Sequence, residues 1–355
     1  MMTVKQGNIF FDESDAHFIR KFGYEKASEM VLDFKSVNDL PFIFDTWQLA
    51  AFFNTSRKKL FDYSKNASSH YKRIVIKKKN GKDRILYSPD DVLKFYQTKI
   101  LREILYKLPV SQYATAYVKG RNLSENASVH VGKKFILKLD ITDFFAGITS
   151  DRVYNAVFNT RYFPKFIGYI LTSLCCRNYT LPQGAPTSPA ISNIVMRNFD
   201  CYIGSWCEKH AIHYTRYCDD LTFSSDKPLF HVYKKAESFL EKMGFQLNES
   251  KTHFAVESGR QCVTGLIVNE KLSVPAEYKR KLRAEIFYAL KYGLADCISH
   301  CKMQDFIMDG KPDEIKYFHH LLGRLNFVLS IEPSNKWFSS VYKKFMLLDP
   351  SKDLN

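Results

Sequence analysis

An almost uninterrupted apolar run that ends in an aspartate constrains this chain more than any other segment. Residues 135–141 read Phe-Ile-Leu-Lys-Leu-Asp-Ile, which is typical of a buried strand that delivers the carboxylate of Asp140 at its end. Residues 211–224 read as two strands with Asp219 and Asp220 at the turn between them. If these strands lie side by side in one sheet, the three carboxylates come together.

Three carboxylates gathered in this way suit a pair of Mg²⁺ ions. Such ions take hard oxygen ligands and leave positions open for substrate phosphates. Two of them together activate an attacking hydroxyl and stabilise the leaving oxygen in phosphoryl transfer. A structural interpretation stays open, in which Asp143 caps a helix and Asp219 and Asp220 are ordinary turn residues. The acids alone therefore indicate a two-metal site and nothing finer.

A segment rich in Pro and Gly lies between these acids in the sequence. Residues 181–189 read Leu-Pro-Gln-Gly-Ala-Pro-Thr-Ser-Pro, and a helix is expected directly after them, with Thr187 or Ser188 as its cap. A loop of this kind at the start of a helix can hold a phosphate or a base pair. A purely structural turn is the alternative.

The section before the first acid reads as mainly helical with one extended pair in it. Residues 71–77 and 84–89 are prone to form strands and are joined through Asn80-Gly81, a strong hairpin signal. Residues 91–108 then carry apolar groups at helical spacing.

The section after the paired acids is mixed. Residues 229–243 read as a helix that ends at Gly244. Its expected apolar stripe is Phe230, Tyr233, Phe239, Leu240 and Met243. A strand pair is expected near residues 245–247 and 263–268, and helices again from Pro275. The chain as a whole therefore reads as an α+β protein.

Positive charge is spread along the whole chain. Lys and Arg number 52 against 37 Asp and Glu, so the formal net charge is +15. Basic clusters with tyrosines among them favour a polyanionic partner, because such side chains neutralise phosphates while rings stack on bases. A basic surface without a partner stays open. The clusters are Arg57–Lys59, Lys72–Arg73, Lys77–Lys79, Lys133–Lys134, Lys279–Lys281 and Lys343–Lys344.

Targeting and redox signals point to the cytoplasm. The first residues include acids, which argues against a signal peptide, and no run approaches the ~18 apolar residues of a membrane span. Eight cysteines without small-domain spacing are expected to be reduced thiols. Cys297, His300 and Cys301 lie in an apparent helix without a second pair at matching spacing, so no zinc site is expected there.

Several segments, in chain order, resemble the motifs of reverse transcriptases. Residues 139–145, Leu-Asp-Ile-Thr-Asp-Phe-Phe, resemble the first catalytic-strand motif, and residues 181–189 resemble the template and nucleotide motif. Tyr217-Cys-Asp-Asp220 resembles the Tyr-x-Asp-Asp motif. Gly244-Phe245, with Asn248 and Lys251, resembles the next palm motif. Together the matches extend over residues 70–270.

Two shorter matches narrow the subfamily. Asn126-Ala-Ser-Val-His130 resembles the Asn-Ala-x-x-His element of bacterial retron reverse transcriptases, and Val263-Thr264-Gly265 resembles their Val-Thr-Gly element. The chain is therefore identified as similar to a retron-type reverse transcriptase. This resemblance implies a right-hand polymerase fold, with an antiparallel palm sheet packed on helices. The implied parts are an N-terminal region with fingers over 1–130, a palm over 131–270 with a fingers helix near 150–180, and a helical thumb over 271–355.

The resemblance also implies an activity and partners. Relatives of this kind start DNA synthesis from a guanosine 2′-OH of a cognate structured non-coding RNA and copy part of that RNA, so the product is branched. Partners are then this RNA, its DNA product, deoxynucleotide triphosphates and an effector protein in anti-phage defence. An intron-type or diversity-generating reverse transcriptase is one alternative. A catalytically silent RNA-binding scaffold is another.

The resemblance assigns roles to individual residues. Asp140 and Asp219, helped by the Ile141 carbonyl and supported by Asp220, would hold two Mg²⁺ ions, and Asp220 could instead serve mainly the hairpin. Phe145 would act as a steric gate against a ribose 2′-OH, and Lys251 as a proton donor to pyrophosphate or as a plain surface lysine. The full expected nucleotide-binding set is Lys77, Lys79, Arg84, Asp143, Phe144, Phe145, Gln183 and Lys251. The expected RNA-binding set is Asn126, His130, Val263, Thr264, Gly265, Tyr278, Lys279, Arg280 and Arg283.

Two residues depart from the pattern of these enzymes. Gly147 stands where a Ser is usual after the paired Phe, and Cys218 stands where Ala is more usual in the Tyr-x-Asp-Asp motif. Neither departure removes an expected metal ligand.

Overall fold

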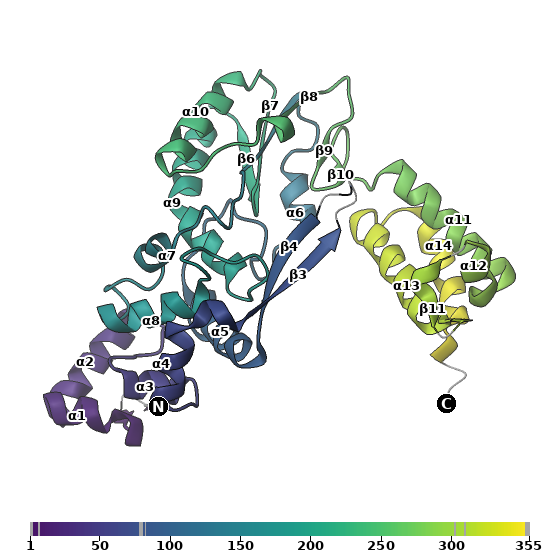
Figure 1. Cartoon of the computed structure of the whole chain (residues 1–355). Coiled ribbons are helices and arrows are strands. Elements are labelled where there is room, and N and C mark those ends of the chain that lie inside the picture. Colours follow the sequence, from purple (N-terminus) through teal and green to yellow (C-terminus); the bar gives the residue numbers. More distant parts are fainter. Residues whose placement is uncertain are drawn as a thin grey trace. The chain divides into compact units, whose positions relative to one another are not determined.

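A computed structural model of the chain describes residues 3–5, 8–77, 81, 83–301, 303–308 and 310–351. Helices and antiparallel strands are mixed along it, which confirms the expected α+β class (Figure 1). The chain divides into two compact units. The first comprises Met1–Arg121, Lys138–Leu221 and Phe230–Thr252, and the second comprises Asn122–Leu137, Thr222–Leu229 and His253–Asn355. The expected division into fingers, palm and thumb is a functional one and stays a prediction.

The first unit begins with short strands and capped helices. The side chain of Asp45 accepts hydrogen bonds from the N–H groups of Trp47 and Gln48 and so caps α3, and Ser56 caps α4 in the same way. Phe18 of α1 and Val31 of α2 belong to one small core, together with neighbouring aromatic rings such as Phe42. The elements are β1 Thr3–Lys5, β2 Asn8–Phe10, α1 Ala16–Phe22, α2 Tyr24–Val37, α3 Thr46–Phe52 and α4 Arg57–Lys65.

A two-stranded antiparallel ribbon follows, as the sequence predicts. It consists of β3, Tyr71–Lys77, and β4, Asp83–Pro89. The predicted turn residue Asn80 lies outside the described residues. Helix α5, Asp91–Glu103, follows, and it is capped by Asp90, whose carboxylate accepts a hydrogen bond from the Leu93 N–H.

Four strands in the order β6-β7-β5-β8 form the largest sheet. Strand β5, Phe135–Asp140, is the predicted apolar strand, and β5 and β7 each contribute residues to both units. Strands β6, His213–Tyr217, and β7, Asp220–Ser225, are neighbours joined by only two residues, so they form an antiparallel hairpin. Strand β8, His253–Val256, has no counterpart among the sequence predictions.

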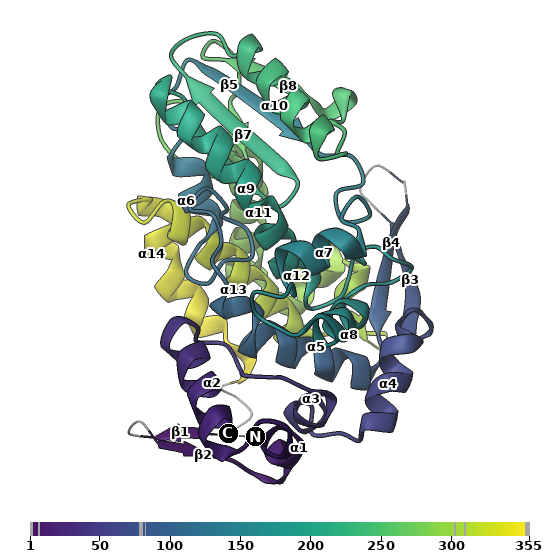
Figure 2. The ribbon, with the colours of Figure 1, turned by 90° about the vertical axis from the view of Figure 1, so that its left-hand side faces the viewer.

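Helices of the first unit lie along this part of the chain. Helix α9, Ser188–Lys209, packs on β6, and α10, Phe230–Lys242, lies beside α9 (Figure 2). The predicted apolar stripe of α10 is partly wrong. Leu240 is buried as predicted, but Phe230 is 63% exposed, and the other buried positions are Val232 and Ala236. Helices α7, Ser150–Ala156, and α8, Lys165–Cys175, complete the unit.

The segments near residues 245–247 and 263–268, predicted to pair as strands, do not pair with each other. Leu247 instead forms an antiparallel bridge with Ile141, which extends the path of β5. Strand β9, Cys262–Val263, pairs with β10, Leu266–Ile267, about a turn of Thr264 and Gly265. Both turn residues have positive φ, 46° and 86°, as a tight two-residue hairpin turn requires.

The second unit is mainly helical. Leu282, Ile286 and Ala289 form the buried face of α11, in agreement with the predicted periodicity, and they share one core with the other helices. In the described part of the chain, no helix has the length and apolar character that crossing a membrane requires. The elements are α6 Leu123–Ser128, α11 Ala276–Tyr292, α12 Leu294–His300, β11 Ile307–Met308, β12 Lys311–Pro312, α13 Glu314–Ile331 and α14 Lys336–Phe345.

Candidate active site

The carboxylate of Asp140 stands at the end of β5 and is held by a lysine. Asp140 is only 8% exposed, and the Lys251 Nζ donates to both of its carboxylate oxygens, at 2.8 and 2.9 Å. The Asn248 N–H donates to the Asp140 carbonyl at 2.8 Å and so fixes the segment that carries Lys251. The hydrogen bond to Asp140 is the largest cause of a raised pKa at Lys251. The predicted nucleotide-binding lysine therefore lies among the acids.

The other two acids lie at the β6–β7 hairpin. Asp219 is the second residue of its turn, and its carbonyl accepts from the Ile141 N–H at 3.2 Å, which brings the turn beside the end of β5. Asp220 is the first residue of β7 rather than part of the turn. The pKa of Asp220 is raised to about 6, mainly by burial and then by the negative charges of Asp219 and Asp140. The sequence prediction that the three acids come together is confirmed by these contacts.

Asp140, Asp219 and Asp220 are the residues that would hold divalent cations. Within the described ranges, no group of three or more His, Cys, Asp or Glu side chains is arranged as a metal-ligand set. The ammonium group of Lys251 lies on Asp140, and this side chain is 58% exposed. Crowded, partly buried carboxylates that disfavour one another's charged form match the oxygen ligands of Mg²⁺. The residues present therefore fit the expected ions.

A cavity of about 470 Å³ brings together three of the predicted nucleotide-binding residues, Arg84, Phe145 and Gln183. The Arg84 Nε donates to the Gln183 Oε1 at 3.2 Å, so a β4 residue and the Pro- and Gly-rich loop form one wall. The remaining lining residues are Ile76, Leu86, Tyr117, Gly184, Ala185, Ser188 and Pro189.

The loop at residues 181–189 is held against β4 by its backbone. The Tyr87 N–H donates to the Gln183 carbonyl at 2.8 Å. Gly184 has φ of 119°, and a Cβ there would lie 2.8 Å from the Tyr87 carbonyl oxygen, so only glycine fits. Thr187, one of the two predicted candidates, is the N-cap residue of α9, but its side chain makes no capping hydrogen bond. The Ser188 Oγ donates to the Pro182 carbonyl instead.

The two neighbouring phenylalanines have different environments. Phe145 is half-buried and lines the cavity, whereas Phe144 is 3% exposed and packs on Phe245 with ring centroids 5.9 Å apart. The Phe144 side chain therefore belongs to the core, and the expected role of this residue in nucleotide binding stays a prediction. Asp143, with φ of 44°, is exposed at the turn before them, and the Gly147 N–H donates to its carbonyl. Lys77 is exposed at the end of β3, and Lys79 lies outside the described residues.

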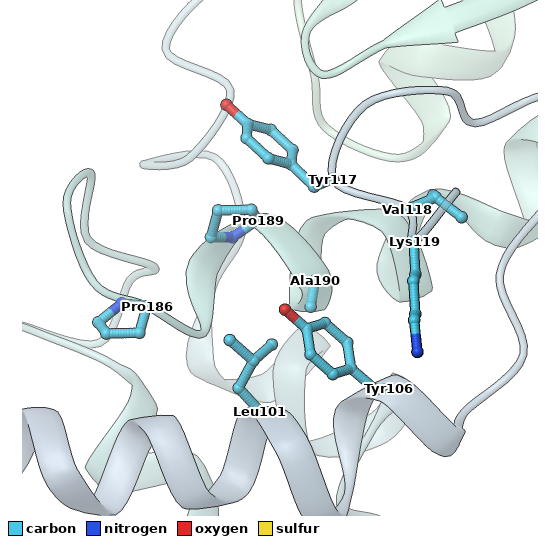
Figure 3. A pocket seen from close by; sticks show the side chains of 8 residues that line it. All are labelled: Leu101, Tyr106, Tyr117, Val118, Lys119, Pro186, Pro189 and Ala190. Carbon is cyan, nitrogen blue, oxygen red and sulfur yellow. The ribbon is translucent and has the colours of Figure 1, made fainter. Parts of the chain in front are cut away.

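A second cavity, of about 510 Å³, shares Tyr117 and Pro189 with the first. Figure 3 shows Tyr117 and Tyr106 on two sides of it, with Lys119 extending from the segment that carries Val118. The pKa of Tyr117 is raised to about 12. Burial is the main cause, and Cys218, to which the Tyr117 hydroxyl is hydrogen-bonded, makes a smaller contribution. Tyr117 is not among the predicted site residues, because no local pattern in the sequence distinguishes it from other tyrosines.

Part of the predicted RNA-binding set is structural. Asn126, His130 and Val263 are buried, so these side chains offer no surface to RNA. The Asn126 Nδ2 donates to the Thr264 Oγ1 at 3.3 Å, and the His130 Nδ1 lies 2.7 Å from the Ser224 Oγ. These contacts tie α6 to the β9–β10 turn and to β7, while Gly265 is exposed at the turn and Thr264 is half-buried.

The predicted residues of α11 also divide. The Lys279 Nζ binds the Glu332 carboxylate at 2.6 Å, and Tyr278 packs on Phe327, so both stabilise the helix bundle. Arg280 is exposed. Arg283 is exposed as well, with its guanidinium above the rings of Trp337 and Phe338. Arg280 and Arg283 are thus the charged residues of the set that are exposed to a polyanion.

Comparisons with known proteins show which family the chain belongs to. The family model of reverse transcriptases (RNA-dependent DNA polymerases) matches residues 76–317. The retron Ec86 reverse transcriptase of Escherichia coli is 31% identical over 79% of this chain and 83% of that protein. The retron Ec83 enzyme of the same species is 30% identical over 75% and 85%, and the retron Mx65 enzyme of Myxococcus xanthus is 34% identical over 61% and 55%. The chain thus belongs to the retron reverse transcriptases, which are RNA-directed DNA polymerases.

Proposed function

We propose that this polymerase copies part of a cognate structured non-coding RNA, starting from a guanosine 2′-OH, and that the branched RNA–DNA product acts with an effector protein in anti-phage defence. One observation supports the catalytic part above all: Asp140, Asp219 and Asp220 lie together at the end of β5. The similarity to retron enzymes supports the rest.

In this proposal Asp140 and Asp219, with the Ile141 carbonyl, hold two Mg²⁺ ions. Bound there, the ions lower the pKa of the primer hydroxyl and neutralise charge on the α-phosphate and the leaving pyrophosphate. Asp220, whose pKa is raised to about 6, supports the turn and adds negative charge beside the ions.

In the proposed cycle, Lys251 has two successive roles. Without metal its ammonium group compensates the charge of Asp140, to which it donates two hydrogen bonds. With Asp140 engaged as a metal ligand, the exposed side chain of Lys251 would be available to donate a proton to pyrophosphate.

The incoming deoxynucleotide occupies the cavity lined by Phe145, Gln183 and Arg84. Arg84 neutralises the triphosphate together with Lys77 and Lys79, and Phe145 faces the sugar. The adjoining cavity, with the rings of Tyr106 and Tyr117, takes the template strand, because unpaired bases stack on aromatic side chains.

Affinity for RNA is expected to fall steeply with salt. Each phosphate neutralised by Lys or Arg releases a counterion, so between 50 and 200 mM salt the affinity should drop by about 10³-fold for six or more contacts. Filter binding of the cognate RNA across a salt series measures this slope. Arg280→Ala should reduce the slope by about one, and Arg280→Lys, which keeps the charge, should restore it. A flat salt dependence would contradict the electrostatic interpretation.

Nucleic acid that copurifies with the full chain tests the proposed product. We expect RNA and single-stranded DNA joined through a 2′,5′ linkage, so that a debranching enzyme separates them and exposes a DNA 5′ end. The matched control is the Asp219→Asn protein, which should copurify with RNA alone. Unbranched DNA made on added RNA with a DNA primer would indicate an intron-type or diversity-generating enzyme. RNA without any DNA synthesis would indicate a scaffold.

A further inference from the structure

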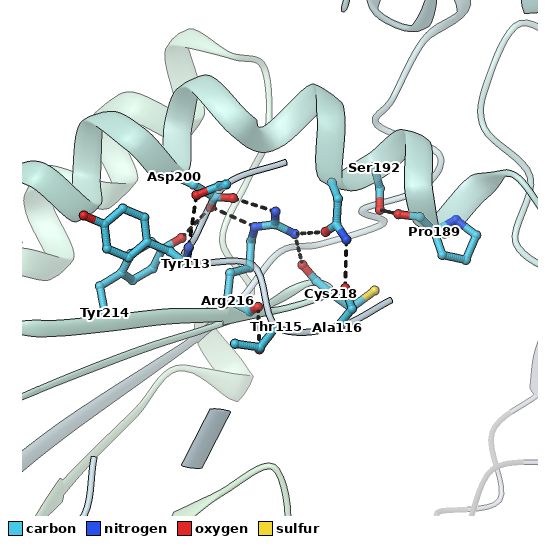
Figure 4. Close-up of polar contacts among 11 residues, drawn as sticks. Tyr113, Thr115, Ala116, Pro189, Ser192, Asp200, Tyr214, Arg216 and Cys218 are labelled. Atoms are coloured by element: carbon cyan, nitrogen blue, oxygen red, sulfur yellow. Dashed lines mark hydrogen bonds and ion pairs between the residues drawn. The ribbon is translucent and has the colours of Figure 1, made fainter. Parts of the chain in front are cut away.

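A completely buried ion pair lies behind the catalytic turn. Arg216, on β6, and Asp200, on α9, have no exposed side-chain surface. The Arg216 Nε and Nη2 donate to the two carboxylate oxygens of Asp200 at 2.8 and 2.6 Å, in the two-bond geometry that only a guanidinium offers. Figure 4 shows this pair between the helix and the strand. Burial is the largest single effect and lowers the pKa of Arg216, but the charge and the hydrogen bonds of Asp200, with smaller effects of Tyr214 and Cys218, together raise it.

The remaining nitrogen of the guanidinium contacts the turn itself. The Arg216 Nη1 donates to the Cys218 carbonyl at 3.1 Å and to the Asn193 Oδ1 at 3.0 Å. Cys218 has φ of 61°, a conformation that costs about 1–2 kcal/mol for a residue with a side chain. The next residue is Asp219. The direction of the Asp219 side chain therefore depends on a strained peptide that a buried arginine holds.

A second path reaches the same turn from the other side. The Asn193 Nδ2 donates to the Ala116 carbonyl at 2.8 Å, and the residue after Ala116 is Tyr117, whose hydroxyl is hydrogen-bonded to the Cys218 side chain. The Thr115 N–H and Oγ1 both donate to the Arg216 carbonyl, at 2.9 and 3.0 Å. The network thus holds both the backbone and the side chain of Cys218.

We propose that Arg216 is a positioning residue for DNA synthesis: anchored by Asp200 and Asn193, it holds the Cys218 carbonyl and so fixes the Asp219 carboxylate in the place where it binds metal. The inference rests on the proposed role of Asp219 as a ligand. A buried guanidinium needs acceptors for all of its N–H groups, and the acceptors of Nη1 here are the Cys218 carbonyl and the Asn193 Oδ1, so the anchored pair is tied to the catalytic turn.

The test compares two variants of the same network. Arg216→Lys keeps a positive charge for Asp200, but a single ammonium group cannot also reach the turn in the geometry of the fork. Tyr214→Phe is the matched control. It removes the 2.8 Å hydrogen bond from the Tyr214 hydroxyl to Asp200 and leaves the contact to Cys218 in place. Both variants perturb the buried pair, and only the first changes the turn.

For each full-length protein the measurements are the melting temperature, the rate at saturating deoxynucleotide, the KM for deoxynucleotide, and the Mg²⁺ concentration that gives half the maximal rate. For Arg216→Lys we expect a rate lower by about 10- to 100-fold and a higher Mg²⁺ requirement, with KM changed by less than about twofold. For Tyr214→Phe we expect a lower melting temperature and a rate within about twofold of wild type. Equal rates in the two variants, at a temperature where both are folded, would overturn the proposal.

If Arg216→Lys does not fold, Asn193→Ala replaces it. This variant removes an acceptor that orients the Nη1, and a rise in the Mg²⁺ requirement is again expected, whereas wild-type Mg²⁺ dependence overturns the proposal. The Asp219→Asn protein separates the two levels of the argument. If it is active, the ligand assignment fails. If it is inactive while Arg216→Lys behaves as wild type, only the positioning role fails.

Discussion

Replacing Asp219 with asparagine is expected to abolish DNA synthesis and to leave RNA binding largely intact. Asparagine has nearly the same shape and suits a turn, so the β6–β7 hairpin should persist. The change removes one negative charge from the cluster with Asp140 and Asp220. If the two-metal assignment holds, the lost stabilisation of the transition state is about 4 kcal/mol or more, which corresponds to about a 10³-fold lower rate.

Primer extension on the cognate RNA measures this effect, and filter binding measures RNA affinity in the same preparations. The control is Asp226→Asn, an acid just beyond the other end of β7 whose contact is a surface pair with Lys133 at 3.6 Å. Such a pair contributes about 1 kcal/mol at most, so wild-type extension is expected. Extension by Asp219→Asn at the wild-type rate would contradict the assignment of Asp219 as a metal ligand.

Replacing Phe145 with valine is expected to raise the use of ribonucleotides relative to deoxynucleotides. Phe145 lines the same cavity as Gln183 and Arg84, and a smaller side chain leaves room for a 2′-OH. Contacts of this size discriminate by about 10- to 200-fold, so we expect the ratio of kcat/KM values to shift by at least about tenfold. Single-nucleotide incorporation with each nucleotide type measures the ratio.

The neighbouring residue supplies the control for this experiment. Phe144→Leu alters a buried ring that packs on Phe245 and should lower thermal stability without changing the nucleotide ratio. An unchanged ratio in Phe145→Val, or an equal shift in both variants, would count against Phe145 as the gate.

The elements that carry the acids were predictable because they depend on local patterns. The apolar run at 135–140 and the β-prone segments around Asp219 are confirmed as β5, β6 and β7. A strand that ends in an acid, repeated at a hairpin, is a signal that short windows of sequence contain.

The contacts that complete the site were not predictable, because they join distant segments. Nothing local shows that Lys251 lies on Asp140, 111 residues earlier in the chain. Phe144 and Phe145 are identical in type, and only the turn at Asp143 decides which one enters the core. Arg216 read as an ordinary strand residue, since its buried partner stands on a helix whose packing on β6 is a tertiary event.

The close approach of Gly184 to Tyr87 has a consequence for how this enzyme tolerates change. The hydrogen bond from the Tyr87 N–H to the Gln183 carbonyl joins β4 to the Pro- and Gly-rich loop, so the two segments form one continuous part of the cavity wall. A residue inserted into or deleted from either segment would shift the register of both. Engineered or natural variation in length should therefore collect outside these two segments.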